Sequence, residues 1–157
     1  MSYDLFGTKI QDTYQRLLQV TSGNTIVDGH GNDVTITATI NGTGSTYTPN
    51  ITNVSNLSSS TAYECQYILF ESTCTVSGKV TIGPISVALS TILGISLPIT
   101  SDLQTDNNCC GVAFCPSVAG QGASILGDAI NDRALLQFIS SNLTSQDMFF
   151  NFTYKII

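Results

Sequence analysis

The last eleven residues, Asp147 to Ile157, carry the pattern that most limits what this chain can fold into. One parity of the run is wholly apolar, and its members are Met148, Phe150, Phe152, Tyr154 and Ile156. The other parity, which includes Asn151, Thr153 and Lys155, is mostly polar. Because successive side chains of a strand point to opposite faces, the run predicts a β-strand with one buried face. Aromatic and β-branched residues suit such a strand.

The preceding apolar run, Ala134 to Ile139, predicts a second strand. It is apolar on both parities except at Gln137, which indicates a strand covered on both sides. Ser140 to Gln146 has the composition of a turn. We therefore expect two antiparallel strands, the second of which closes the domain. Every residue of this stretch is interpreted as structural.

Further strand-like segments precede this pair. They are Ala62 to Phe70, Thr73 to Ile82, Ile85 to Ile99, Val112 to Phe114 and Ala123 to Leu126. Strand signals recur about every ten residues, and no strong helical pattern follows residue 60. This spacing predicts a mainly β fold, an antiparallel β-sandwich or jelly-roll-like domain of roughly eight strands.

The chain is expected to have three parts: an N-terminal segment over residues 1–40, a Ser/Thr/Asn-rich linker over 41–60, and the β-sandwich domain over 61–157. The segment from Ser2 to Val20 fits one face of a short helix, which we prefer, but it also fits an extended arm. Asn24 to Asp28 and Val34 to Ile40 favour strands. Since a helix this short is not stable alone, the segment must pack on its own domain, on sister copies or on a larger assembly.

Composition excludes several classes of function. Only 10% of the residues are charged, the net charge is -6, and the five basic residues are scattered singly. Such a chain lacks the basic patch that nucleic-acid binding needs. No apolar run reaches the roughly 18–20 residues of a membrane span. The N-terminus does not resemble a signal peptide, so synthesis in a cytoplasm is expected.

No motif predicts catalysis, so the expected protein is not an enzyme and has no catalytic residue, cofactor or metal. The one histidine, His30, lies between two glycines and is interpreted as a turn residue. Asp128 and Asp132 are better explained by turn hydrogen bonds than as a catalytic pair. Asp102, Asp106, Asn107 and Asn108 could bind calcium, but their spacing does not match an EF-hand and favours a solvated loop.

The five cysteines leave three interpretations open. They are Cys65, Cys74, Cys109, Cys110 and Cys115. Free thiols are preferred. A disulfide between Cys65 and Cys74 and a four-cysteine zinc site remain alternatives, although the spacing lacks the paired knuckles typical of zinc.

Both ends of the chain resemble bacteriophage virion fibre proteins. The N-terminal D-L-F-G-T-K-I-Q-D-T-Y-Q-R-L-L-Q-V and G-N-T-I-V-D-G-H-G-N resemble their attachment segments. The blocks C-T-V-S-G-K-V-T-I, S-L-P-I, G-D-A-I-N-D-R-A-L-L-Q-F and F-N-F-T-Y-K-I-I resemble their trimeric tip or head domains. These motifs are structural rather than catalytic.

This resemblance implies a short head fibre or decoration protein on the capsid, acting as a homotrimer in adhesion. Its partners would be other virion proteins (the major capsid protein or a tail or portal component) and a host surface glycan. The implied attachment residues are Leu5, Phe6, Ile10, Tyr14, Leu17 and Leu18. One alternative is a receptor-binding tail-fibre or tail-tip protein. Another is a depolymerase, which would need clustered carboxylates, whereas the 11 acidic residues here are scattered.

Overall fold

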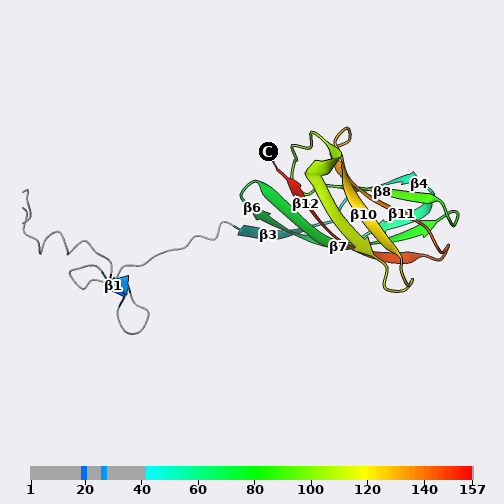
Figure 1. Ribbon diagram of the computed structural model, residues 1–157, viewed down its shortest axis with the longest axis horizontal. Helices are drawn as coiled ribbons and strands as arrows, with labels where there is room; N and C mark the ends of the chain where they lie inside the picture. Colours follow the sequence, from blue (N-terminus) through cyan, green and yellow to red (C-terminus); the bar gives the residue numbers. More distant parts are fainter. Residues whose placement is uncertain (1–18, 21–25, 28–41, 157) are drawn as a thin grey trace, which may run out of the picture. The chain divides into compact units, whose positions relative to one another are not determined.

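The computed structural model describes residues 19–20, 26–27 and 42–156 (Figure 1). Its contacts divide the chain into two units, Met1–Ile40 and Asn41–Ile157. In the first unit, β1 (Gln19–Val20) pairs antiparallel with β2 (Ile26–Val27). The second strand lies within a predicted strand, whereas Gln19–Val20 ends the segment for which a helix was preferred. The strand predicted for residues 34–40 lies outside the described residues.

The second unit is one antiparallel sheet of ten strands, so the prediction of a mainly β, antiparallel fold is confirmed. In chain order the elements are β3 (Gly42–Tyr47), β4 (Ile51–Ser55), β5 (Leu57–Ala62), β6 (Cys65–Phe70), β7 (Thr73–Pro84), β8 (Ser90–Ser96), the short 3-10 helix η1 (Asp106–Asn108), β9 (Cys109–Phe114), β10 (Gly122–Asp128), β11 (Arg133–Ile139) and β12 (Gln146–Lys155). Their order in the sheet is β3-β6-β7-β12-β9-β10-β11-β8-β4, and β5 pairs separately with β7.

The sheet curls into a half-barrel because short connections join the strands at its two ends. The long strand β7 pairs with β6 along its first half and with β5 along its second half. At the far end of the sheet, β4 pairs with β8. Only Asn56 separates β4 from β5, so the β8 edge has to curve back toward β7. One curled sheet thus encloses the core (Figure 1).

The inner face of β12 forms the centre of the core. Met148, Phe150, Phe152 and Tyr154 are each at most 4% exposed, and they lie between β7 on one side and β9 on the other. Gly111 of β9 stands opposite Phe152, where any Cβ atom would collide with that side chain. The predicted buried face of the C-terminal strand is therefore confirmed.

The linker predicted for residues 41–60 is not found, because most of these residues belong to β3, β4 and β5. Their side chains are largely exposed, and only a few, among them Tyr47, Ile51 and Leu57, reach the core. Strands with so few buried residues lack the apolar alternation that identifies a strand in sequence. Their Ser, Thr and Asn content therefore resembled that of a flexible connection.

Two further expectations about the last strands were wrong. The strands β11 and β12 are not neighbours: β11 lies between β10 and β8, whereas β12 lies between β7 and β9. Local sequence pattern does not say which strand a run will pair with. In addition, β11 is covered on one face only, since Gln137 and Ile139 are exposed.

The strand predicted over Ile85 to Ile99 is shorter than expected, because β8 spans only Ser90–Ser96.

Asn56 fixes the corner between β4 and β5. Its backbone is left-handed, with φ of 55°, a conformation that asparagine tolerates better than most residues. Its side-chain amide donates to the carbonyl of Ser86 at 2.9 Å and to Oγ1 of Thr91 at 2.8 Å, and its Oδ1 accepts from the Ser86 amide at 2.9 Å. These bonds hold the corner against the connection from β7 to β8.

We predict that Asn56→Ala lowers the free energy of unfolding by about 4–5 kcal/mol. Each lost hydrogen bond costs about 1 kcal/mol, and a left-handed alanine adds about 1–2 kcal/mol. Urea unfolding followed by circular dichroism measures the change. The control is Asn107→Ala, because Asn107 is an exposed asparagine of η1 and its loss should cost less than about 0.5 kcal/mol. Equal losses in the two variants would contradict this role of Asn56.

Candidate binding groove

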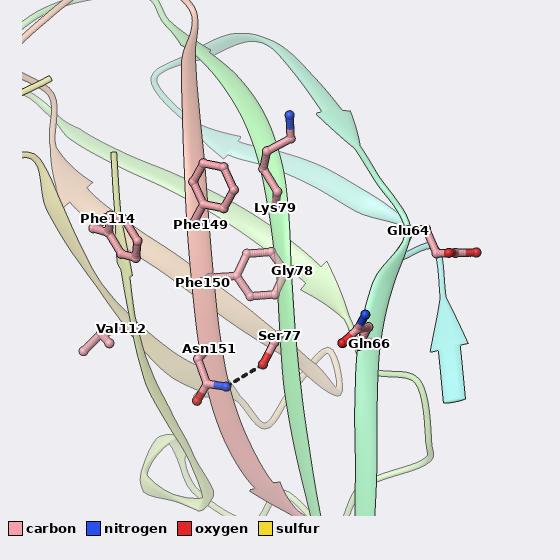
Figure 2. Close-up of a pocket in the computed structure, with 10 residues that line it drawn as sticks. All are labelled: Glu64, Gln66, Ser77, Gly78, Lys79, Val112, Phe114, Phe149, Phe150 and Asn151. Atoms are coloured by element: carbon pink, nitrogen blue, oxygen red, sulfur yellow. Dashed lines mark hydrogen bonds between the residues drawn. The ribbon is translucent and has the colours of Figure 1, made fainter. Parts of the chain in front are cut away.

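A groove lies where the pairing along one edge of β7 is interrupted. Ala62, the last residue of β5, pairs with Val80, and Gln66 near the start of β6 pairs with Ser77. Gly78 and Lys79 are left between these two pairs, opposite the connection from β5 to β6. The resulting cavity measures about 460 Å³. Its lining residues are Glu64, Gln66, Ser77, Gly78, Lys79, Val112, Phe114, Phe149, Phe150 and Asn151 (Figure 2).

Aromatic side chains form one side of this groove. Phe149 of β12 is the registered neighbour of Phe114 on β9, and their rings stack with centroids 5.9 Å apart and planes 24° apart. Phe149 is 39% exposed and Phe114 58% exposed, and Val112 beside them is 66% exposed. Apolar side chains gathered in this way on a surface usually mark a binding site. Figure 2 shows Phe114 and Val112 on one side of β12 and β7, with Glu64 and Gln66 on the other.

Polar contacts hold the upper rim of the groove in place. The Lys79 ammonium lies 4.0 Å from the centroid of the Tyr63 ring and 3.1 Å from Oδ2 of Asp147. The Thr81 hydroxyl donates its proton to Asp147 at 2.5 Å, and its oxygen accepts from the Tyr63 hydroxyl at 3.3 Å. The hydrogen bond from Thr81, followed by that from Lys79, lowers the pKa of Asp147 below its usual value. This arrangement keeps the Lys79 side chain beside the aromatic rings.

The lower part of the groove offers hydrogen-bonding groups. The Asn151 side-chain amide donates to the Ser77 hydroxyl at 2.7 Å, across the pairing of β12 with β7. This bond orients the amide and leaves its carbonyl oxygen, Oδ1, as an acceptor toward the solvent. Glu64 and Gln66 are exposed on the opposite side. The groove thus combines a flat aromatic surface with amide, hydroxyl and carboxylate groups, an arrangement suited to binding a ligand.

The attachment residues predicted near the N-terminus lie outside the described residues, as does His30. They are Leu5, Phe6, Ile10, Tyr14, Leu17 and Leu18. The groove residues themselves were not singled out from the sequence. The sequence did contain one indication of the groove, because Phe149 is a large apolar residue on the face of β12 whose other side chains are polar. Its pairing with Phe114, thirty-five positions earlier, depends on the sheet order.

All five cysteines are free thiols, and all except Cys110 are buried. The side chain of Cys65 lies against Gly78, whereas Cys74 is four residues away along β7, a distance of roughly 13 Å. A disulfide needs Cα atoms within about 7 Å, so Cys65 and Cys74 cannot pair in this fold. Burial raises the pKa of Cys109 to about 12 and raises those of Cys65 and Cys74 as well. These three thiols stay protonated at neutral pH.

The acidic loop before β9 is organised by its own hydrogen bonds. Oδ1 of Asn108 accepts from the backbone amides of Gln104 and Thr105, at 3.0 and 2.9 Å, and so caps η1. Asp102 accepts from the Gln104 side chain at 2.7 Å and lies 3.7 Å from the ammonium of Lys155. Over the part of the chain that the structure describes, no three His, Cys, Asp or Glu side chains gather in a possible metal site.

Asp128 and Asp132 have separate partners in the turn between β10 and β11. Asp128, whose side chain is 12% exposed, accepts from the Arg133 guanidinium at 2.8 Å and from the Asn131 side chain at 2.8 Å. Asp132 accepts instead from the Ser101 hydroxyl. Burial by itself would raise the pKa of Asp128, but the bonds from Asn131 and Arg133 outweigh it and lower that pKa.

We predict that Asp128→Asn destabilises the fold at pH 7 by about 1 kcal/mol, because it removes a charge-assisted hydrogen bond. Since the folded pKa of Asp128 is lowered, its contribution is present above the unfolded value of about 3.9 and disappears as the pH falls through the folded value. The difference between variant and wild type should therefore shrink in acid. Urea unfolding at pH 7 and at decreasing pH measures it.

The matched control is Asp106→Asn, which changes an exposed acidic residue of η1. This variant should follow the wild type at every pH. A difference between Asp128→Asn and wild type that persists unchanged at low pH would contradict the assigned role of the Asp128 carboxylate.

Comparison with protein-family models, with curated proteins and with solved structures gave no match. Within the described ranges, no helix has the length and apolar character needed to cross a membrane. The groove therefore has to be interpreted from its own geometry.

Proposed function

We propose that this chain is a structural virion protein of a bacteriophage, a short fibre or decoration protein on the capsid surface that aids adhesion. The adhesive role in this proposal is supported by one observation, the exposed pair of rings of Phe114 and Phe149 beside the polar groups of the groove. Two aromatic rings exposed on the surface of a β unit indicate a binding site, because contact with a partner would remove their apolar surface from water. The resemblance of both chain ends to virion fibre proteins supports the location.

In this proposal the two units of the chain have different tasks. Residues 1–40 attach the protein to another virion component, such as the major capsid protein or a tail or portal protein. The β unit is displayed outward as a homotrimer and contacts a host surface glycan. Each groove needs only weak affinity, because three grooves per fibre and many fibres per particle raise the combined affinity. No turnover is involved, so the protein acts by binding alone.

We predict that antibodies against the β unit, labelled with gold, decorate the capsid surface of intact particles in electron micrographs. Labelling at the tail would instead favour the receptor-binding tail-fibre or tail-tip alternative. If purified particles carry no copy of the chain by mass spectrometry, the virion proposal is wrong.

A variant of the full chain tests the attachment residues in the same particles. Phe6→Ser combined with Leu17→Ser should reduce the number of copies bound per particle, since both apolar side chains are proposed to be buried at the docking site. The control is Ile130→Ser, because Ile130 is 95% exposed in the β unit and should leave the copy number unchanged.

A further inference from the structure

We infer that the groove beside Phe149 binds a neutral pyranose sugar, with one face of the ring stacked on the aromatic side chains. This inference rests on the proposed adhesive function and specifies its ligand by chemical class. Three properties of the groove support it: its aromatic surface, its polar groups and its charge.

The aromatic surface fits the apolar face of a sugar. The C–H groups on one face of a pyranose carry slight positive charge, and an aromatic ring presents its negative π-face to them. Phe149 and Phe114 are neighbours, with ring centroids 5.9 Å apart, so the groove offers two aromatic rings to a ligand. Two neighbouring rings favour a chain of sugar units over a single monosaccharide.

The polar groups lie where the hydroxyls of such a sugar would be. Oδ1 of Asn151 faces solvent because the amide nitrogen is bound to Ser77. Gln66 and Glu64 stand across the groove from the aromatic rings (Figure 2). Amide and carboxylate groups supply the paired donors and acceptors that sugar hydroxyls need. The cavity of about 460 Å³ is within the usual range for small-ligand sites, roughly 300–1,000 Å³.

The charge of the site favours a neutral glycan over an anionic one. Lys79 is the basic residue of the lining, and its ammonium is already paired with Asp147 at 3.1 Å. Glu64 adds a negative charge on the opposite side. The whole β unit holds three basic and seven acidic side chains, so a sialylated, sulfated or phosphorylated glycan would be repelled.

The test uses the full-length protein on a printed array of oligosaccharides. The neutral set consists of oligomers of glucose, N-acetylglucosamine, galactose and mannose, and the anionic set of sialylated and sulfated glycans. We expect retention on at least one neutral oligomer and a fall of about tenfold or more in apparent affinity for Phe149→Ala. Retention on no neutral oligomer, or on anionic glycans alone, would overturn the inference.

A second variant separates ring stacking from general apolar contact. Phe149→Leu keeps an apolar side chain of similar reach but removes the π-face, so it should lose binding as Phe149→Ala does. The control is Ile139→Ala, because Ile139 is an exposed apolar residue of β11 outside the groove, 60% exposed. Circular dichroism and urea unfolding check that each variant is folded. Wild-type binding by Phe149→Leu would overturn the stacking arrangement.

The solution mass of wild type and Phe149→Ala, measured by light scattering, decides between a sugar and a second copy of the chain as occupant. An unchanged mass supports the sugar, and a lower mass in the variant overturns it in favour of a subunit interface. Failure of the sugar inference is distinguishable from failure of the virion proposal, because the array result does not depend on where the chain lies on the particle.

Discussion

The packing of β12 between β7 and β9 holds this fold together. Its inner face supplies Met148, Phe150, Phe152 and Tyr154 to the core, of which Tyr154 and Phe152 are the two largest fully buried side chains, and full burial of each such side chain is worth about 1.5–3 kcal/mol. Tyr154 adds a polar tie, because its hydroxyl donates to the carbonyl of Ile99 at 2.8 Å and accepts from the Ile99 amide at 3.1 Å. Without β12, the strands on either side of it would lose their common neighbour.

The same strand explains why a recognition surface is available on the outside. Because the side chains of β12 alternate, burying its inner face leaves Phe149 and Asn151 outward, next to Phe114 and Ser77 on the flanking strands. The interruption of pairing opposite Lys79 then hollows this surface into a groove. The proposed recognition and the stability thus come mainly from opposite faces of one strand, although Phe150 of the inner face also lines the groove.

The strand pattern made the fold class predictable, since β7, β10, β11 and β12 all fall in segments with a clear apolar signal. The strands β3, β4 and β5 were missed because most of their side chains face solvent. The groove could not be predicted in full for a different reason. Phe149 could be recognised in the sequence as an apolar residue on the polar face of its strand. Its contact with Phe114 and the interruption of strand pairing at Lys79 depend on the order of the strands in the sheet, which local periodicity does not encode.

The central claim is that the two faces of β12 have separate tasks, and the unfolding free energies of two variants test it most directly. Phe152→Ala removes a fully buried ring and should cost about 3–5 kcal/mol. Phe149→Ala removes an exposed ring from the opposite face and should cost less than about 1 kcal/mol. Both are measured by urea unfolding of the purified protein. Equal losses in the two variants, or a larger loss for Phe149→Ala, would contradict the account.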